Sequence, residues 1–276
     1  MIEAKKIIVW YNQPTNRYAM KYVFLICFTT IVFASRAQLN DSLHPRVYYW
    51  NELQPVKEGS RIRTQILEGS TTSLSHFEVH TSTLEPGKAP HPPHKHDDQE
   101  ELIIVKEGNL KITISNTTRT LGPGSIAFAM PGDEHGIENA GNIQASYYIL
   151  KYKGKLPKHE RGKQAGGSFM LDWNELKTTN TGKGYRRDFF NRATSQLVQF
   201  EMHTTALNAD SASHAPHTHV QEEIILILRG NVTMHIDGKL FAASPGDLVF
   251  LPSRIPHALL NTGKEQCEYF AFQWRN

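Results

Sequence analysis

The stretch HPPHKHDDQEE, residues 91–101, returns in nearly the same form as HAPHTHVQEE, residues 214–223. Each copy places three histidines within six residues and ends in two adjacent glutamates. The first histidines of the two copies, His91 and His214, lie 123 residues apart (214 − 91 = 123). A dense motif that recurs at a fixed spacing indicates a duplicated structural unit.

The repeat extends far beyond the histidines. WNEL at 50–53 returns at 173–176, and FEVHT at 77–81 returns as FEMHT at 200–204. After the histidines the spacing falls by one residue, and the Pro-Gly at 123–124 returns at 245–246. The chain is therefore two copies of one domain. We predict an N-terminal extension with a secretory signal peptide at 1–37, a first barrel at 38–152, a linker at 153–167 and a second barrel at 168–276.

Each copy is typical of β-structure. ELIIVKEGNLKITI, residues 101–114, and EIILILRGNVTMHI, residues 223–236, are rich in β-formers and contain a Gly-Asn turn. The first strand of each pair is apolar on both faces, which indicates burial on both sides. No stretch shows long helical periodicity. The sequence predicts an all-β fold of two tandem barrels of the double-stranded β-helix, or jelly-roll, type.

Histidine spacing predicts a metal site in each copy. His94 and His96 lie two apart, so on an extended strand both imidazoles point to one side. Imidazoles together with a carboxylate suit a divalent transition metal such as Mn, Fe, Ni, Cu or Zn. We expect one such ion per barrel, with positions left open for water, O2 or substrate. The predicted metal ligands are His94, His96, Glu101, His135, His217, His219, Glu223 and His257. Glu100 and Glu222 are the alternative carboxylates.

Each half resembles a cupin, and together they resemble a bicupin. The family's first motif, G-x5-H-x-H-x(3–4)-E-x6-G, is matched from His94 to Gly108 and from His217 to Gly230. Its second motif, G-x5-P-x-G-x2-H-x3-N, is matched around His135 and His257, with Met130 and Arg254 as departures at turn positions. The resemblance implies a complete set of three histidines and one glutamate in both halves.

The resemblance leaves the activity open, because cupin folds host enzymes, sugar binders and storage proteins. Retention of all ligands favours a metal-dependent enzyme, of dioxygenase or decarboxylase type, acting on a small oxygenated or carboxylated molecule. The alternative is a non-catalytic protein that binds or senses a sugar or an acid with a metal. Candidate acid-base residues repeat in both halves: His91, His214, Glu78, His80, Glu201 and His203. Arg63 and Arg186 are either clamps for a substrate carboxylate or partners in structural ion pairs.

Residues 20–37, MKYVFLICFTTIVFASRA, have the pattern of a secretory signal, with either Met1 or Met20 as the start. We expect an exported protein, periplasmic or extracellular, that is not attached to the membrane after removal of the signal. Residues 1–37 carry a surplus of four positive charges, so the remainder has a net charge near −1 (3 − 4 = −1) and offers no argument for nucleic acid. The expected partner is a small molecule, and a homodimer is left open. Cys267 is the one cysteine beyond the leader, which excludes an internal disulfide there.

Overall fold

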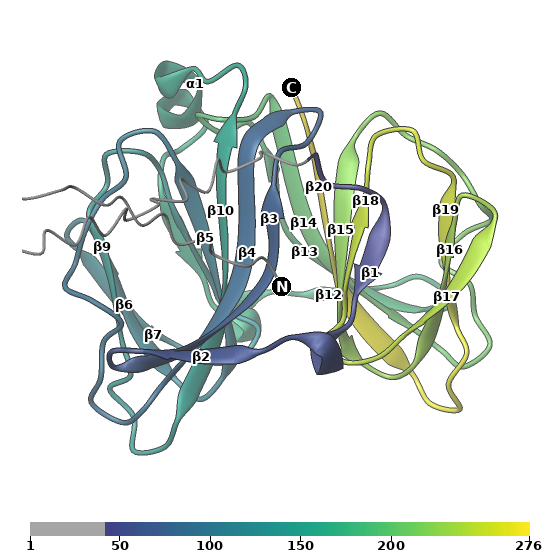
Figure 1. The fold of residues 1–276 in the computed structure, drawn as a ribbon, viewed down its shortest axis with the longest axis horizontal. Helices are drawn as coiled ribbons and strands as arrows, with labels where there is room; N and C mark the ends of the chain where they lie inside the picture. Colours follow the sequence, from purple (N-terminus) through teal and green to yellow (C-terminus); the bar gives the residue numbers. More distant parts are fainter. Residues whose placement is uncertain (1–41) are drawn as a thin grey trace, which may run out of the picture. The chain divides into compact units, whose positions relative to one another are not determined.

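The computed structural model describes residues 42–276, so the predicted leader lies outside the described residues and export stays a prediction. Within residues 42–276 the strands form two seven-stranded and two three-stranded sheets (Figure 1). The predicted all-β class with two barrels is confirmed. No helix in this part of the chain is long and apolar enough to cross a membrane.

The first barrel combines one seven-stranded sheet with one three-stranded sheet, both antiparallel. The larger sheet has the order β11 (Phe169–Leu171), β8 (Ile126–Ala129), β5 (Glu100–Glu107), β10 (Ala145–Gly154), β4 (Leu74–Leu84), β3 (Arg61–Gly69) and β2 (Pro55–Glu58). The smaller sheet has the order β7 (Thr117–Leu121), β6 (Leu110–Ile114) and β9 (His135–Glu138).

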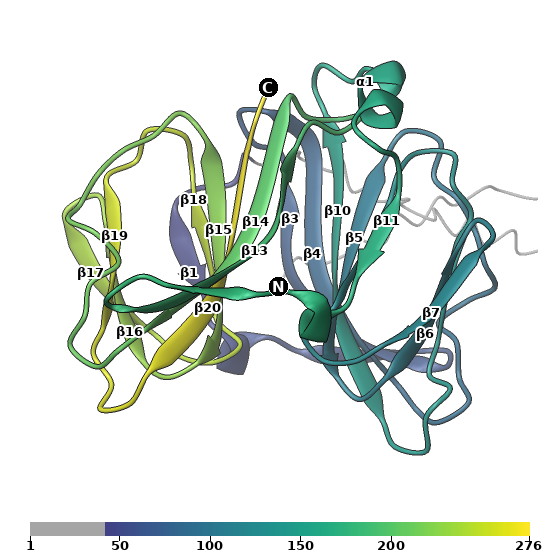
Figure 2. The same cartoon turned by 180° about the vertical axis from the view of Figure 1, so that it is seen from behind.

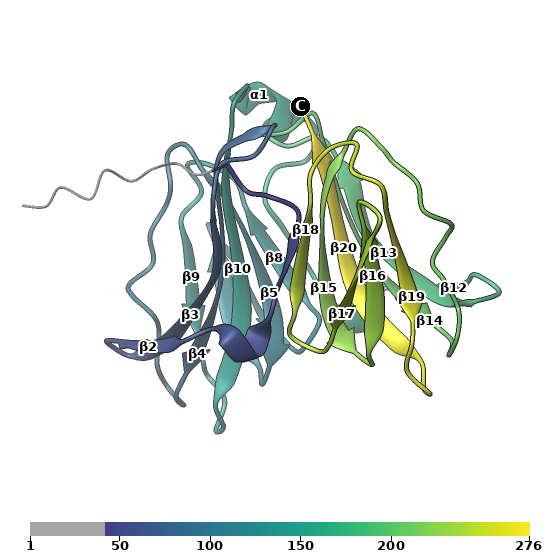
Figure 3. The same cartoon turned by 45° about the vertical axis from the view of Figure 1, so that its right-hand side comes forward.

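The second barrel repeats this design, and Figure 3 shows its smaller sheet in front of the larger one. The larger sheet has the order β1 (Arg46–Tyr48), β18 (Leu248–Leu251), β15 (Glu222–Arg229), β20 (Cys267–Arg275), β14 (Gln199–Leu207), β13 (Gly184–Arg192) and β12 (Thr178–Asn180). The smaller sheet has the order β17 (Lys239–Ala243), β16 (Val232–Ile236) and β19 (His257–Asn261).

The two halves exchange a strand. β1, from the start of the first half, pairs with β18 of the second barrel, and β11, from the start of the second half, pairs with β8 of the first (Figures 1 and 2). Each large sheet therefore ends on a strand supplied by the other half. The domain ranges predicted from the repeat stay predictions, but the sheets are assembled across those ranges.

The repeated WNEL motif closely follows each exchanged strand and contacts the other half of the chain. It forms short 3-10 helices, η1 (Trp50–Glu52) and η2 (Trp173–Glu175). The backbone N–H of Trp50 donates to Asp247 Oδ1 at 2.8 Å, and that of Trp173 donates to Ser125 Oγ at 3.0 Å. The Trp173 indole covers Gly124 so closely that an added Cβ would lie 2.4 Å from Cε3 of the ring. The recurrence of WNEL thus reflects a contact between the two halves.

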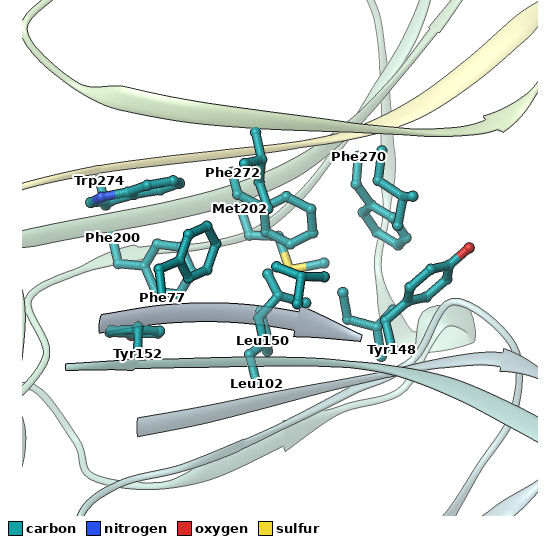
Figure 4. Close-up of a cluster of buried hydrophobic side chains, with 14 of the residues drawn as sticks. Phe77, Leu102, Tyr148, Leu150, Tyr152, Phe200, Met202, Phe270, Phe272 and Trp274 are labelled. Carbon is teal, nitrogen blue, oxygen red and sulfur yellow. The ribbon is translucent and has the colours of Figure 1, made fainter. Parts of the chain in front are cut away.

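The outer faces of the two large sheets pack against each other in one shared core. Along β5, Leu102 and Ile104 face this shared core, whereas Ile103 and Val105 face the interior of the first barrel. Figure 4 shows the shared core, to which both barrels contribute large side chains: Phe77, Leu102, Tyr148, Leu150, Tyr152, Phe200, Met202, Phe270, Phe272 and Trp274. Full burial of one such side chain contributes about 1.5–3 kcal/mol. The apolar character of both faces of the strand is explained, because the second face is covered by the other barrel.

The predicted linker, residues 153–167, contains the helix α1 (His159–Gln164). The Arg161 guanidinium donates to the carbonyl of Thr194 at 2.7 Å and to that of Ser195 at 3.2 Å. The connector is therefore attached to the second barrel through this basic residue.

Candidate metal centres

Backbone pairing brings the first histidine group together. His94 and His96 lie in the loop before β5, Glu101 is the second residue of β5, and His135 begins β9. The backbone N–H of His94 donates to the His135 carbonyl at 2.9 Å, and the reverse bond measures 2.7 Å. This isolated antiparallel bridge holds the histidine loop against β9. It explains how residues 41 apart in the sequence (135 − 94 = 41) meet at one place.

One ligand atom from each of His94, His96, Glu101 and His135 lies within 4.8 Å of every other. His96 Nε2 lies 3.1 Å from Glu101 Oε2, and His135 Nε2 lies 3.6 Å from Glu101 Oε1. His135 Nδ1 donates to the Asp133 carbonyl at 3.1 Å, which places the free lone pair of a neutral ring on Nε2. Three imidazoles and one carboxylate at this spacing are a donor set for a divalent transition metal.

The second barrel assembles the equivalent group. Ligand atoms of His217, His219 and His257 lie within 4.8 Å of one another. Glu223 Oε2 lies 3.3 Å from His219 Nε2 and 3.1 Å from His257 Nε2. Nδ1 of His219 donates to the Gln221 carbonyl at 3.0 Å, so Nε2 is again the free nitrogen. Glu223 thus completes the group by its contacts with two of the three histidines.

Two buried nitrogens test whether these residues fit a metal. Nε2 of His135 and Nε2 of His257 are buried, and within the described part of the chain neither makes a well-aligned hydrogen bond, although Glu101 Oε1 lies 3.6 Å from the first and Glu223 Oε2 lies 3.1 Å from the second. A buried polar atom without a partner costs about 1–3 kcal/mol. Both atoms face the neighbouring ligand atoms, and a bound cation would satisfy them. The residues present therefore fit a metal ion.

The protonation states of Glu223 and His94 also suit metal binding. By contrast, Glu101 outweighs burial and raises the pKa of His135, and Glu223 raises the pKa of His219. Burial alone would raise the pKa of Glu223, but the neighbouring His219 and His257 lower it to about 2, so this carboxylate is ionised at neutral pH. Burial and the neighbouring histidines lower the pKa of His94 to about 4, which keeps its imidazole neutral. Neutral imidazoles and ionised carboxylates are the forms that bind metals.

The remaining predicted site residues lie close to these groups. Glu100 and Glu222 are turned away from the histidines and contact the opposite barrel. His91 and His214 are exposed and lie outside the ligand groups. The ring of His91 contacts that of His94, and the ring of His214 contacts that of His217. The ring centroids lie 4.2 Å apart for His91 and His94.

Four of the candidate acid-base residues form one Glu-His contact in each barrel. His203 Nδ1 donates to Glu201 Oε1 at 3.1 Å, and His80 Nδ1 lies 2.7 Å from Glu78 Oε1. Each carboxylate is also paired with an arginine: Arg63 to Glu78 at 2.6 Å, and Arg186 to Glu201. Both arginines thus form ion pairs, and Arg186 also lines the cavity of the second barrel, so the substrate clamp stays a prediction for Arg186.

A cavity of about 440 Å³ opens onto the second group. It is lined by residues of the predicted ligand set together with polar side chains, among them His203, His214, His217, Glu223, His257, Lys183, Tyr269 and Gln273. Lys183, Tyr269 and Gln273 were missed in the sequence. The register offers a signal for Gln273, because it lies opposite Glu223 on β20 and its side-chain amide donates to Glu223 Oε1 at 3.3 Å.

Fold and donor groups together define a double-barrel protein of the metal-binding type. A family model described as "Cupin domain" matches residues 80–150 and 204–272, which together make up half of the chain, and the protein belongs to the cupin family. The match covers one domain in each half and so supports the two-barrel arrangement. It does not identify the ligands, whose assignment stays a prediction.

Solved structures with the same fold share little sequence with this chain. Protein Ylba from E. coli has a TM-score of 0.64 at 20% identity, with 83% of this chain and 89% of that chain covered. AerE from Microcystis aeruginosa has a TM-score of 0.63 at 16% identity, covering 81% and 97%. A variant of oxalate decarboxylase from Bacillus subtilis has a TM-score of 0.65 at 13% identity, covering 84% and 78%. Among curated proteins no match was found.

Proposed function

We propose that the protein is a metal-dependent enzyme that binds one divalent transition metal in each barrel and acts on a small oxygenated or carboxylated molecule. One observation supports the proposal: in the cavity of the second barrel, titratable side chains lie beside the candidate ligands His217, Glu223 and His257. A cavity lined by apolar side chains alone would favour a binding protein. Acid-base groups next to open metal positions favour chemistry.

The proposed ligands are His94, His96, Glu101 and His135 in the first barrel and His217, His219, Glu223 and His257 in the second. A metal bound there would supply Lewis-acid polarisation of a substrate oxygen. The protein's own residues then decide how the substrate is held and where its proton goes.

His203 is the proposed acid-base group. Its Nδ1 donates to Glu201, so the neutral ring carries its acceptor lone pair on Nε2. The hydrogen bond and ion pair of Glu201 fix that carboxylate, which in turn fixes the ring. Because His203 lines the cavity, it can take a proton from a bound substrate or return one.

Size and charge of the cavity suit a small acid. About 440 Å³ lies at the lower end of the range for small-molecule sites. Lys183 lines the cavity and donates to a neutral group, the Ala212 carbonyl at 3.0 Å, so this contact leaves its positive charge available to a carboxylate. The fold similarity to oxalate decarboxylase supports the decarboxylase type, and the dioxygenase type remains its rival within the same proposal.

The proposal is tested with protein loaded with Mn²⁺ or Fe²⁺ and a panel of small mono- and dicarboxylates and hydroxy acids. We expect CO2 release or O2 uptake with at least one acid. His203→Gln should abolish turnover while metal content stays unchanged. His80→Gln, the equivalent change in the first barrel, is the matched control and should retain turnover in the second barrel. Tight binding of an acid without CO2 release or O2 uptake would reject the enzyme and establish a metal-dependent binding protein.

A further inference from the structure

The first glutamate of each repeated pair has no part in the metal donor groups, yet it is fully buried. Glu100 is 0% and Glu222 is 1% exposed. Successive side chains on a strand point to opposite faces, so each of these carboxylates faces the shared core while its neighbour, Glu101 or Glu223, faces the barrel interior. A buried carboxylate needs partners, and those of Glu100 and Glu222 come largely from the other barrel.

Glu222, on β15 of the second barrel, is held by the loop 71–73 of the first barrel. Its Oε2 accepts from Thr71 Oγ1 at 2.9 Å and from the Ser73 N–H at 2.8 Å. Its Oε1 accepts from the Thr72 N–H at 2.9 Å. Trp274 Nε1 adds a fourth hydrogen bond at 3.1 Å. Both oxygens of Glu222 are therefore fixed, three of the four bonds coming from the opposite barrel.

Glu100, on β5 of the first barrel, is held by the loop 194–196 of the second barrel. Its Oε1 accepts from the Ser195 N–H at 2.7 Å and from the Gln196 N–H at 3.3 Å. Thr194 is the repeat equivalent of Thr71 (194 − 71 = 123), and each threonine hydroxyl also accepts from the backbone N–H three residues later. A glutamate held by backbone N–H groups from a loop of the opposite barrel, here called a clasp, thus occurs twice, once in each direction. Glu222 has both oxygens bonded, whereas Oε2 of Glu100 has no hydrogen-bond partner among the described residues.

The clasp and the metal group use the same two strands. Glu222 pairs in register with Trp274, and the next pair is Glu223 with Gln273. Trp274 donates to Glu222 on the core face, and Gln273 donates to Glu223 on the barrel face. Because Glu222 and Glu223 are adjacent on β15, a shift of Glu222 also displaces the strand backbone that carries Glu223.

We propose that Glu100 and Glu222 are positioning residues, through which each barrel fixes the carboxylate ligand of the opposite barrel's metal site. The inference rests on the proposed metal sites. Metal affinity is sensitive to such support, because removal of a group that orients a ligand costs about 10–100-fold in affinity. Loop 71–73 thus belongs functionally to the second metal site, although it lies in the first barrel.

The test uses two single-site proteins, with Co²⁺ as the probe in competition with a chromophoric chelator. His96→Ala leaves only the second site, and His219→Ala leaves only the first. Thr71→Val should weaken Co²⁺ binding at the second site by about 10-fold and leave the first within about twofold. Thr71→Ser, which keeps the hydroxyl, should restore the affinity.

Thr194→Val is the matched control and should show the reverse pattern, with the first site weakened and the second spared. General destabilisation would weaken both sites in both variants, and that result would overturn the inference. Unchanged affinity of the second site in Thr71→Val would overturn it as well. If neither single-site parent binds Co²⁺, the proposed metal sites themselves are wrong, and the positioning role is rejected with them.

Discussion

Lys151 and Gln273 hold equivalent positions in the two barrels, and one is charged while the other is neutral. Lys151 lies opposite Glu101 in the register of β10 with β5, and Gln273 lies opposite Glu223 in that of β20 with β15. Lys151 Nζ lies 3.3 Å from Glu78 Oε2, whereas the Gln273 amide donates to Glu223. At this position, beside the glutamate of each proposed metal site, the first barrel therefore carries a positive charge and the second a neutral amide.

Removing the positive charge from the first barrel should strengthen metal binding there, and introducing one in the second barrel should weaken metal binding there. We expect Lys151→Gln to tighten Mn²⁺ binding at the first site, and Gln273→Lys to weaken it at the second, each by roughly fivefold or more, because a nearby cation repels the bound ion. Calorimetric titration on single-site proteins measures both effects. Unchanged Mn²⁺ affinity in both variants, each compared with its own single-site parent, would show that the charge at this position does not affect the bound metal.

Loss of one histidine ligand should remove one metal ion. His96→Ala and His219→Ala are each expected to lose about one equivalent of metal per chain relative to the parent protein. Elemental analysis of protein purified without chelator measures this directly. His91→Ala removes an exposed histidine outside the ligand group and should keep the full content. Full metal content in either ligand variant would remove that residue from the site.

The contact of Trp173 with Gly124 should make substitution of that glycine more destabilising than substitution of an open glycine. Gly124 has φ +81°, and Gly132 has a similar φ of +88° with no atom within 4 Å of an added Cβ. Gly132→Ala should therefore report backbone strain alone, about 1–2 kcal/mol of unfolding free energy. Gly124→Ala should cost about 1–3 kcal/mol more through overpacking against the indole. Urea denaturation in the presence of chelator compares the two, and equal losses would show that the indole yields without cost.

Glu78 should stabilise the fold in a pH-dependent manner. Burial alone would raise its pKa, but the neighbouring His76 and His80 and the charge of Lys151 outweigh burial and hold the pKa far below its usual value of 4.5. A lowered folded-state pKa stabilises the protein above pH 4.5, and this contribution is lost as the pH falls further.

The stability advantage of the parent protein over Glu78→Gln should thus be full above about pH 5 and shrink toward pH 3. Chemical denaturation at a series of pH values gives this difference. Glu52→Gln, on the exposed surface of η1, is the control and should show little difference at any pH. An advantage that grows on acidification would contradict the assigned direction.

The fold class could be predicted because its signals are local. Gly-Asn turns, short apolar runs and the long repeat indicate two β-barrels without knowledge of any distant contact. The strand exchange could not be predicted, because its pairs are remote in sequence: Val47 lies opposite Val249. No short-range pattern distinguishes a strand that stays in its own half from one that crosses to the other.

The ligand residues of the candidate site could be predicted, because the spacing of residues in the sequence was enough to select them. The alternation of side chains along a strand separates Glu101 from Glu100, and the structure turns them to opposite faces as that rule requires. Lys151 and Gln273 were missed because each lies on a strand more than 45 residues after the glutamate it faces, and only the register reveals the pairing. The role of loop 71–73 likewise depends on the packing of the barrels.

Anomalous diffraction from crystals equilibrated with Mn²⁺ tests the central claim most directly. We predict one peak in each barrel, within bonding distance of the Nε2 atoms of three histidines and of one carboxylate oxygen, Glu101 in the first barrel and Glu223 in the second. The absence of a peak from both histidine groups, in crystals that show Mn²⁺ elsewhere or not at all, would contradict the assignment of this protein as a metal-dependent enzyme.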